Sequence, residues 1–170
     1  LGLQLQPWHQ AGEDIVVLVQ RHDSEQWPRS ISTDQWLSQV CESLRCYTDR
    51  TIRVRPHPRQ PVNIPPGCVR DQPLKLADTY DDFDLCHSLQ GAWAAVNYNS
   101  GVGIAAVIAG TPLFCDPSSR AAPVANTLWH HIEKPQMPDR TQWLLEISHS
   151  EWTVAEIATG FPLARFGLAL

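Results

Sequence analysis

The order of hydrophobic and polar positions along the first half of the chain is typical of a strand, a helix and a second strand. Residues 15–19 (IVVLV) are a continuous apolar, β-branched run, which predicts a strand buried on both faces, as in a parallel sheet. In residues 34–46 the apolar positions recur at helical spacing, which predicts a helix with Thr33 or Asp34 as its N-cap. Residues 51–55 then alternate and stop at a proline, which cannot donate a ladder hydrogen bond.

The same order of elements returns further along the chain. Residues 92–98 predict a third strand, and residues 104–109 a helix of small residues closed by Gly110 as its C-cap. Residues 111–115 predict a fourth, short strand. A repeated strand, helix, strand order favours a parallel sheet with right-handed crossovers.

The remaining segments predict loop and helix. Residues 56–91 contain six prolines and an acidic stretch, so we expect a long loop with one short helix near 84–90. After residue 120 the pattern predicts helices only, over 121–131, 139–149 and 153–159, the last with a capping box at Thr153 and Glu156.

The predicted fold class is therefore α/β, a Rossmann-like three-layer α/β/α arrangement with a mostly parallel sheet and a helical C-terminal tail. We expect an N-terminal segment or linker (1–14), a Rossmann-like nucleotide-binding core (15–118), a helical tail packed on the core (119–160) and a loose C-terminus (161–170). The expected docking residues of the tail are Trp143, Leu144, Ile147, Trp152 and Ile157.

Composition limits the classes of function. Of the 170 residues, 43% are hydrophobic and 18% charged, which is typical of a globular domain, and no run approaches the roughly 20 apolar residues that a membrane span needs. The net charge of -5 offers no global attraction for nucleic acid. Segment 45–59 nevertheless holds five of the 13 basic residues, which indicates either a small anionic ligand or a solvated basic edge.

The number and spacing of the cysteines, and the spacing of the histidines, argue against disulfide bonds and metal sites. The five cysteines are odd in number and form no CxxC pair, so we expect reduced thiols in a cytoplasmic protein. His130 and His131 lack a carboxylate partner at ligand spacing, and the aspartates near residue 82 lack the EF-hand pattern, so no metal site is predicted. The chain starts at Leu1 without a signal-peptide pattern, and its single methionine is Met137, which fits a fragment, a processed product or a partial reading frame.

The turn Asn99-Ser100-Gly101-Val102-Gly103 is the first candidate site, because it follows a predicted buried strand and opens a helix. Free backbone N–H groups and the positive end of a helix favour an anion, the glycines allow close approach, and Ser100 adds a hydroxyl. The spacing matches neither GxGxxG nor a Walker A loop. The alternative is that Gly101 and Gly103 serve only close packing of helix and strand.

A second candidate follows the second strand, where Arg55 is followed by His57 with a proline on each side of the histidine. Such a histidine donates to a phosphate oxygen or acts as an acid or base, and Arg55 adds a charge-assisted donor. Alternation places Arg53 and Arg55 on one face of the sheet. The alternative is a proline-rich turn with a solvated histidine.

Polar residues also follow the first strand, starting with Gln20 and Arg21. In a parallel sheet all three polar strand ends meet at the carboxyl edge, where open α/β sheets bind ligands. We therefore expect Gln20, Arg21, Arg55, His57, Asn99, Ser100, Gly101 and Gly103 to bind a donor phosphate, with Ser118 in reach from the fourth strand. Asp23 is the acidic residue of these clusters and the candidate catalytic base, beside His57.

These residues together resemble a known family. Gln20 after an apolar strand, Arg55-Pro56-His57-Pro58 after the next, and the 99–103 turn with Gly110-Thr111-Pro112-Leu113 resemble the carboxyl-terminal half of bacterial and phage-borne GT-B glycosyltransferases related to capsular polysaccharide biosynthesis. The resemblance implies a nucleotide-sugar donor whose phosphates lie against His57 and the helix start. It also implies metal-independent transfer without a cofactor, to an unknown glycan or nucleic-acid acceptor.

The sequence departs from that family in two places. Many GT-B proteins carry a glutamate in the helix after the glycine turn, whereas this helix reads Ile104-Ala105-Ala106. GT-B catalysis also uses a cleft between two Rossmann-like domains, so activity implies an upstream or partner domain. Two alternatives stay open, a non-catalytic nucleotide-binding or assembly module that retains the fold, and a sugar-nucleotide epimerase-like protein.

Overall fold

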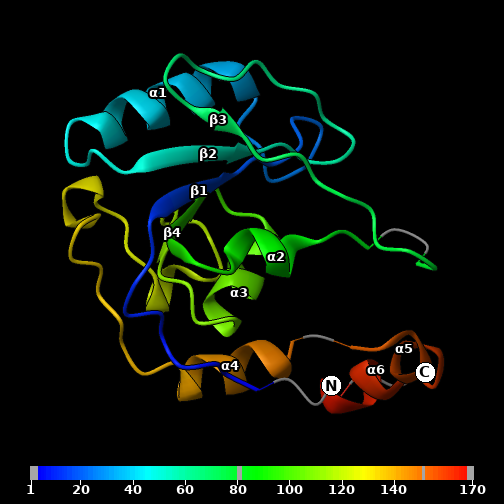
Figure 1. The fold of residues 1–170 in the computed structure, drawn as a ribbon. Helices are drawn as coiled ribbons and strands as arrows, with labels where there is room; N and C mark the ends of the chain where they lie inside the picture. The colour runs from blue at the N-terminus through cyan, green and yellow to red at the C-terminus, as the bar shows by residue number, and fades with distance from the viewer. Residues whose placement is uncertain (1–3, 80–81, 151, 168–170) are drawn as a thin grey trace. The chain divides into compact units, whose positions relative to one another are not determined.

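The computed structural model describes residues 4–79, 82–150 and 152–167 and contains a five-stranded sheet in which every pair of neighbours is parallel. This arrangement confirms the α/β, Rossmann-like fold expected from the sequence (Figure 1). The order is β3-β2-β1-β4-β5, with strands β1 (Asp14–Leu18), β2 (Thr51–Arg55), β3 (Val69–Arg70), β4 (Ala92–Asn97) and β5 (Leu113–Phe114).

β1 is the central strand, and the chain builds the sheet outward from it in both directions. It pairs with β2 on one side, Val17 lying opposite Val54, and with β4 on the other, Val17 lying opposite Val96. The order of strands reverses between β1 and β4. In open α/β sheets such a reversal leaves a crevice outside the carboxyl ends of the strands, which is where ligands bind.

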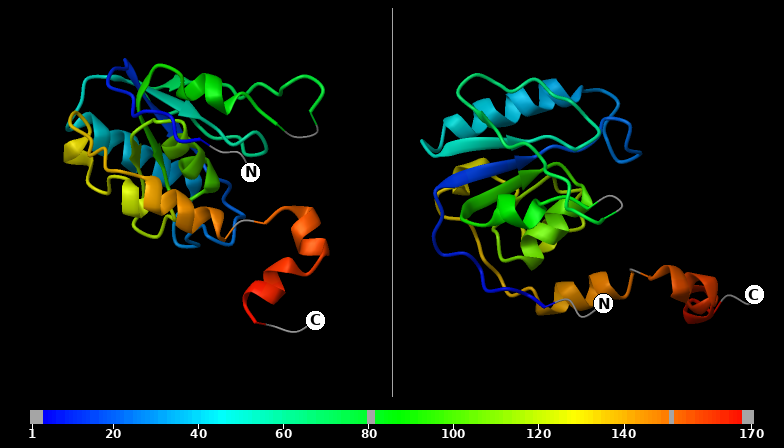
Figure 2. Two further views of the ribbon diagram at one scale, coloured as in Figure 1. Left: turned by 90° about the horizontal axis from the view of Figure 1, so that it is seen from below. Right: turned by 45° about the vertical axis from the view of Figure 1, so that its right-hand side comes forward.

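Helices cover both faces of this sheet (Figures 1 and 2). Helix α1 (Thr33–Arg45) buries Leu37, Leu44 and other apolar residues in one cluster with Ile15, Val17 and Val54. Side chains alternate along a strand, so Arg53 and Arg55 lie on the opposite face. That face carries α2 (Leu85–Leu89) and α3 (Gly101–Ile108), because Arg53 bonds the Ser88 carbonyl and α3 contacts β4 and β5.

The N-terminal segment is fixed to the sheet rather than extending away from it. The backbone N–H of Gln6 donates to Ile108 at the end of α3, and that of His9 donates to Gly110. Gly110 has a φ of +86°, and a Cβ there would lie 2.0 Å from the carbonyl oxygen of Pro7. Glycine is therefore required at this contact, both for its backbone conformation and for the close approach.

The helix predicted over 121–131 is wrong. This stretch contains two short 3₁₀ turns, at Ala122–Val124 and Trp129–His131, separated by extended chain. Asn126 in that extended part exchanges backbone hydrogen bonds with the strand at β5, at Leu113 and Cys115. Pairing with the sheet edge uses the backbone groups that a helix would need, so tertiary contact overrides the local pattern.

The structure divides the chain into two compact units, Leu1–Pro138 and Asp139–Leu170. Residues 119–138 thus belong with the sheet, in contrast to the predicted boundary at 118. The second unit consists of α4 (Thr141–Ser148), α5 (Val154–Ala158) and α6 (Phe161–Arg165), where a loose C-terminus was expected after Gly160. Thr153 forms the predicted capping box with Glu156, whereas Ile157 is 59% exposed and thus does not dock in a core.

Within the part of the chain that is described, no helix is both long enough and apolar enough to cross a membrane.

Candidate functional site

The polar ends of three strands meet in one pocket at the carboxyl edge of the sheet. This crevice pocket has a volume of about 660 Å³. Gln20 and Arg21 after β1, His57 after β2, and Ser100 and Gly101 before α3 all line it. The convergence expected from the parallel sheet is therefore present.

Gln20 connects the strand ends by hydrogen bonds. The residue is 4% exposed, and its side chain accepts from the backbone N–H of Asn99 at 3.3 Å while donating to Ser24 Oγ at 3.2 Å. Asn99 Nδ2 in turn donates to Ser118 Oγ at 3.1 Å. The loops after β1, β4 and β5 are thus joined, and Asn99 and Ser118 lie beside the crevice pocket rather than in its lining.

The two glycines of the α3 turn have different roles. A Cβ on Gly101 would meet no atom within 4 Å, whereas one on Gly103 would lie 2.6 Å from Asn97 Nδ2. Gly103 therefore serves close packing, which was the alternative explanation for the glycines, and Gly101 does not. Gly101 instead leaves the first turn of α3 open toward the crevice pocket, where an anion benefits from the helix N-terminus.

Ser100 is the N-cap of α3, and its side chain makes no capping bond to the first turn. Its Oγ and its carbonyl both accept from Asn97 Nδ2, at 3.3 and 3.0 Å. Asn97 is 1% exposed, and its Oδ1 has no hydrogen-bond partner among the described residues. Asn97 therefore fixes the Ser100 turn by these hydrogen bonds, while Ser100 lines the crevice pocket.

His57 lines both the crevice pocket and a second pocket beside it. Its Nδ1 lies 3.1 Å from the backbone N of Arg59 and accepts that hydrogen bond. In the neutral ring the proton therefore resides on Nε2, because Nδ1 must keep its lone pair. This tautomer is the one that presents an N–H donor at the tip of the ring.

Asp23, the candidate base, is paired with Arg21. Arg21 donates to both carboxylate oxygens, through Nε at 2.7 Å and through Nη2. This hydrogen bonding by Arg21 holds the pKa of Asp23 below its ordinary value. A carboxylate with a lowered pKa is a weaker base, and general bases work best with a pKa near the operating pH. Asp23 does not line the crevice pocket but lines a third pocket, the polar pocket described below.

Most basic residues of segment 45–59 form hydrogen bonds or ion pairs within the protein. Arg55 is 5% exposed and donates to Asp71, Asp84 and Ser88, and Arg53 donates to Asp14 and Asp71. Arg45 and Arg50 are likewise bonded to carbonyl groups, and Arg50 is also paired with Glu133. Arg53 and Arg55 share one face as predicted, but their charge is neutralised by aspartates there.

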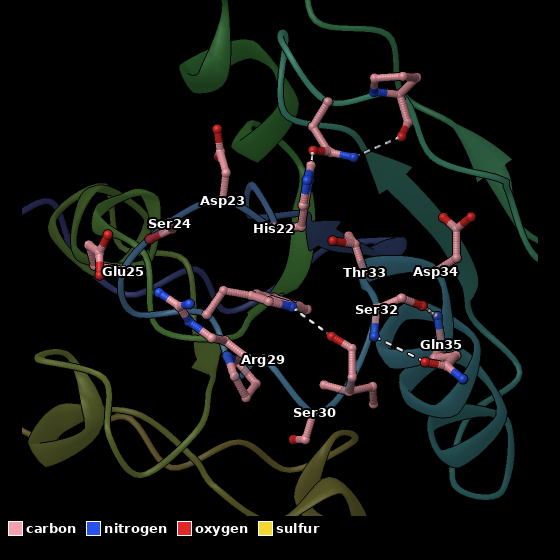
Figure 3. Close-up of a pocket in the computed structure, with 15 residues that line it drawn as sticks. His22, Asp23, Ser24, Glu25, Arg29, Ser30, Ser32, Thr33, Asp34 and Gln35 are labelled. Atoms are coloured by element: carbon pink, nitrogen blue, oxygen red, sulfur yellow. Dashed lines mark hydrogen bonds between the residues drawn. The ribbon is translucent and has the colours of Figure 1, made fainter.

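A polar pocket of about 870 Å³, shown in Figure 3, adjoins the crevice pocket at Ser24 and Glu25. The loop between β1 and α1 forms most of its wall, and His22, bonded to Gln60, closes one side. Thr33 also lines it, and its buried Oγ1 has no hydrogen-bond partner within the described chain. Hydroxyl, amide and carboxylate groups thus surround this space.

The sequence did not identify several residues that shape these pockets. Glu25 and Gln26 line the crevice pocket, and Phe83 and Leu76 line the second one. The loop carrying Phe83 comes from a proline-rich, acidic stretch whose pattern gives no pairing partner. Across the described residues, no group of three or more His, Cys, Asp or Glu side chains is arranged to hold a metal ion.

The fold and the pockets define an α/β domain of doubly wound type, with the crevice pocket at the switch between β1 and β4. In comparisons with models of protein families, with curated proteins and with solved structures, the chain finds no match.

Proposed function

We propose that this chain is the donor-binding domain of a GT-B-type glycosyltransferase, with the donor phosphates of a nucleotide-sugar in the crevice pocket. The observation that carries the proposal is the convergence of His57, Gln20 and the Ser100–Gly101 turn on that one pocket. Three polar strand ends from separate parts of the sequence there provide side-chain and backbone donors. Their combination suits a phosphate better than an apolar or cationic ligand.

The chemistry of the proposed transfer is electrostatic. The Nε2–H of His57 and the first-turn amides of α3 stabilise the leaving nucleoside phosphate as its negative charge grows. In this proposal, stabilisation of the leaving phosphate does not depend on a metal ion. The sugar extends into the polar pocket of Figure 3, where hydroxyl, amide and carboxylate groups offer hydrogen bonds to its hydroxyls.

A second candidate, a nucleotide-binding module without catalysis of its own, is favoured by the state of Asp23. Its carboxylate is paired with Arg21 and its pKa is lowered, so it is poorly suited to accept a proton. The α3 helix also lacks a carboxylate, with Ala105 and Ala106 in its middle. In this version an upstream or partner Rossmann-like domain supplies the base and binds the glycan or nucleic-acid acceptor.

The proposed setting is the cytoplasm, where nucleotide-sugar donors and reduced thiols occur together. All five cysteines are free in the structure, which supports a reducing compartment. A role in capsular polysaccharide biosynthesis, or in a phage-borne counterpart of it, is part of the same proposal and comes from the resemblance described above.

The proposal is tested by titrating UDP, GDP and CMP against the parent protein and His57→Ala by calorimetry. His87→Ala, which removes an exposed imidazole from α2, is the matched control. We expect at least one nucleotide to bind the parent, and His57→Ala to weaken it about tenfold or more, the loss of one hydrogen bond to a charged group. No binding by the parent, or equal binding by His57→Ala, contradicts the proposal.

A further inference from the structure

A second pocket of about 530 Å³ lies next to the crevice pocket, between the end of β2 and the described residues (74–79 and 82–84) of the segment termed the 74–84 loop. Most of its lining is apolar, although His57 and Arg59 are part of it. Phe83 and Leu76 come from the 74–84 loop, and Leu85 comes from α2. Its volume is within the range of small-molecule sites, which are mainly apolar with a few polar groups.

The two pockets are continuous in their lining. Val19, His57 and Val102 line both of them. A ligand that spans this boundary therefore has a polar, anionic end near Ser100 and an apolar end near Phe83. The His57 ring stands between the two ends.

We propose that the apolar pocket holds the base of the nucleotide, so that the ligand of the crevice is a nucleoside phosphate rather than a simple phosphate or sugar phosphate. This inference rests on the proposed function and names the part of the donor that fixes its position. A nucleobase has two apolar faces and a polar edge, which matches an apolar pocket with polar groups at its rim. Stacking on one aromatic ring such as Phe83 strengthens binding about five- to 100-fold per base.

The polar rim adds groups that suit the sugar and the edge of the base. Asp82 lines the pocket and is exposed, and a carboxylate in that position accepts hydrogen bonds from ribose hydroxyls. Helix α3 supplies no carboxylate for this task. The 74–84 loop provides one, Asp82.

The wall that carries Phe83 is held in place by an ion pair. Asp84 Oδ1 accepts from Arg55 Nη2 at 2.6 Å and from the backbone N–H of Leu74 at 2.9 Å. Leu76 and Asp82 are joined by a backbone bond of 2.9 Å, and Phe83 is bridged to Lys75 in antiparallel fashion. Arg55, predicted as a phosphate ligand, is thus placed to position the pocket wall.

The test compares nucleotides with pyrophosphate, which lacks the base. UDP, GDP and pyrophosphate are titrated by calorimetry against the parent protein, Phe83→Ala, Phe83→Tyr and the control Leu74→Ala, which removes a side chain that is 61% exposed on the same loop. We expect the parent to bind at least one nucleotide about tenfold or more tightly than pyrophosphate. Phe83→Ala should weaken that nucleotide about five- to 100-fold and leave pyrophosphate unchanged, from the loss of stacking.

The other two variants test whether Phe83→Ala weakens binding only by disturbing the structure of the loop. Phe83→Tyr keeps the aromatic face and should retain nucleotide affinity, and Leu74→Ala should behave as the parent. Equal affinity of the parent for nucleotide and pyrophosphate, or unchanged nucleotide binding in Phe83→Ala, overturns this inference alone. Loss of pyrophosphate binding together with nucleotide binding in Phe83→Ala also overturns it. Failure of both ligands to bind the parent overturns it together with the proposed function.

Discussion

Arg55 Nη2 lies 2.6 Å from Asp84 Oδ1, and this pair links the end of β2 to the loop before α2. Burial opposes ionisation of Asp84, but the hydrogen bonds from Arg55 and from the Leu74 amide hold its pKa below the ordinary value. Both side chains are mostly buried, 6% and 13% exposed. The pair therefore anchors a segment of chain that contains few other buried groups.

Asp84→Asn should lower the free energy of unfolding by about 1–3 kcal/mol at pH 7, the scale of a hydrogen bond to a charged group. A carboxyl whose pKa is lowered in the folded state stabilises the fold above its unfolded pKa of about 3.9, and this contribution is lost as the pH falls through the folded value. The difference between parent and variant should therefore narrow below about pH 4.

Urea unfolding of both proteins at pH 7 and pH 3 measures this difference. Asp82→Asn, which changes an exposed neighbour on the same loop, is the control and should stay within about 0.5 kcal/mol of the parent. A difference between parent and Asp84→Asn that is the same at both pH values would contradict the assigned ion pair.

Gly103→Ala should destabilise the protein, whereas Gly101→Ala should not. The new Cβ at position 103 would lie 2.6 Å from Asn97 Nδ2, and such overpacking costs about 1–3 kcal/mol. At position 101 the space is open, so thermal unfolding should be close to that of the parent. Equal melting temperatures for the two variants would show that Gly103 is not needed for packing.

Gly110→Ala should be more damaging than either. The residue has a φ of +86°, and its Cβ would lie 2.0 Å from the Pro7 carbonyl oxygen, so the N-terminal segment would have to move. We expect a loss of roughly 2–4 kcal/mol, combining left-handed strain with the clash. Gly67→Ala, which shares the positive φ but has open space, separates the two causes in a urea titration. Equal losses in both variants would leave no role for the contact with Pro7.

Thiol reactivity should follow burial. Burial raises the pKa of Cys115 to about 11 and that of Cys41 still higher, so both remain neutral thiols at pH 8. Cys46 and Cys86 are exposed. Pulse labelling with a thiol reagent at pH 8, read by mass spectrometry, should modify the exposed pair first and the buried pair only after unfolding. Labelling of Cys115 as fast as Cys86 would contradict its placement in the core.

The sequence was most informative where periodicity is strong. The run 15–19 and the alternation of 51–55 predicted the strands that form the centre of the sheet, and the parallel order then predicted the meeting of Gln20, His57 and Ser100. These inferences need only local pattern and the rule that parallel strands end at one edge. The same rule cannot say where a charged side chain finds its partner.

The partners of Arg55 show that limit. Asp71 and Asp84 are 16 and 29 residues away in sequence, in a segment whose prolines and acidic residues carry no period. The two-residue strand β3 was missed for the same reason, since only its pairing with β2 defines it. Long-range contact, not propensity, determines these parts of the molecule.

The central position of β1 has one more consequence. It pairs with β2 on one side and with β4 on the other, so it is the strand that joins the two sides of the sheet. A molecule seated in the crevice pocket touches His57 on one side and Ser100 on the other. It would act as a clamp across the sheet, and a ligand present at 100 times its Kd would raise the unfolding free energy of the whole first unit by about 2.7 kcal/mol.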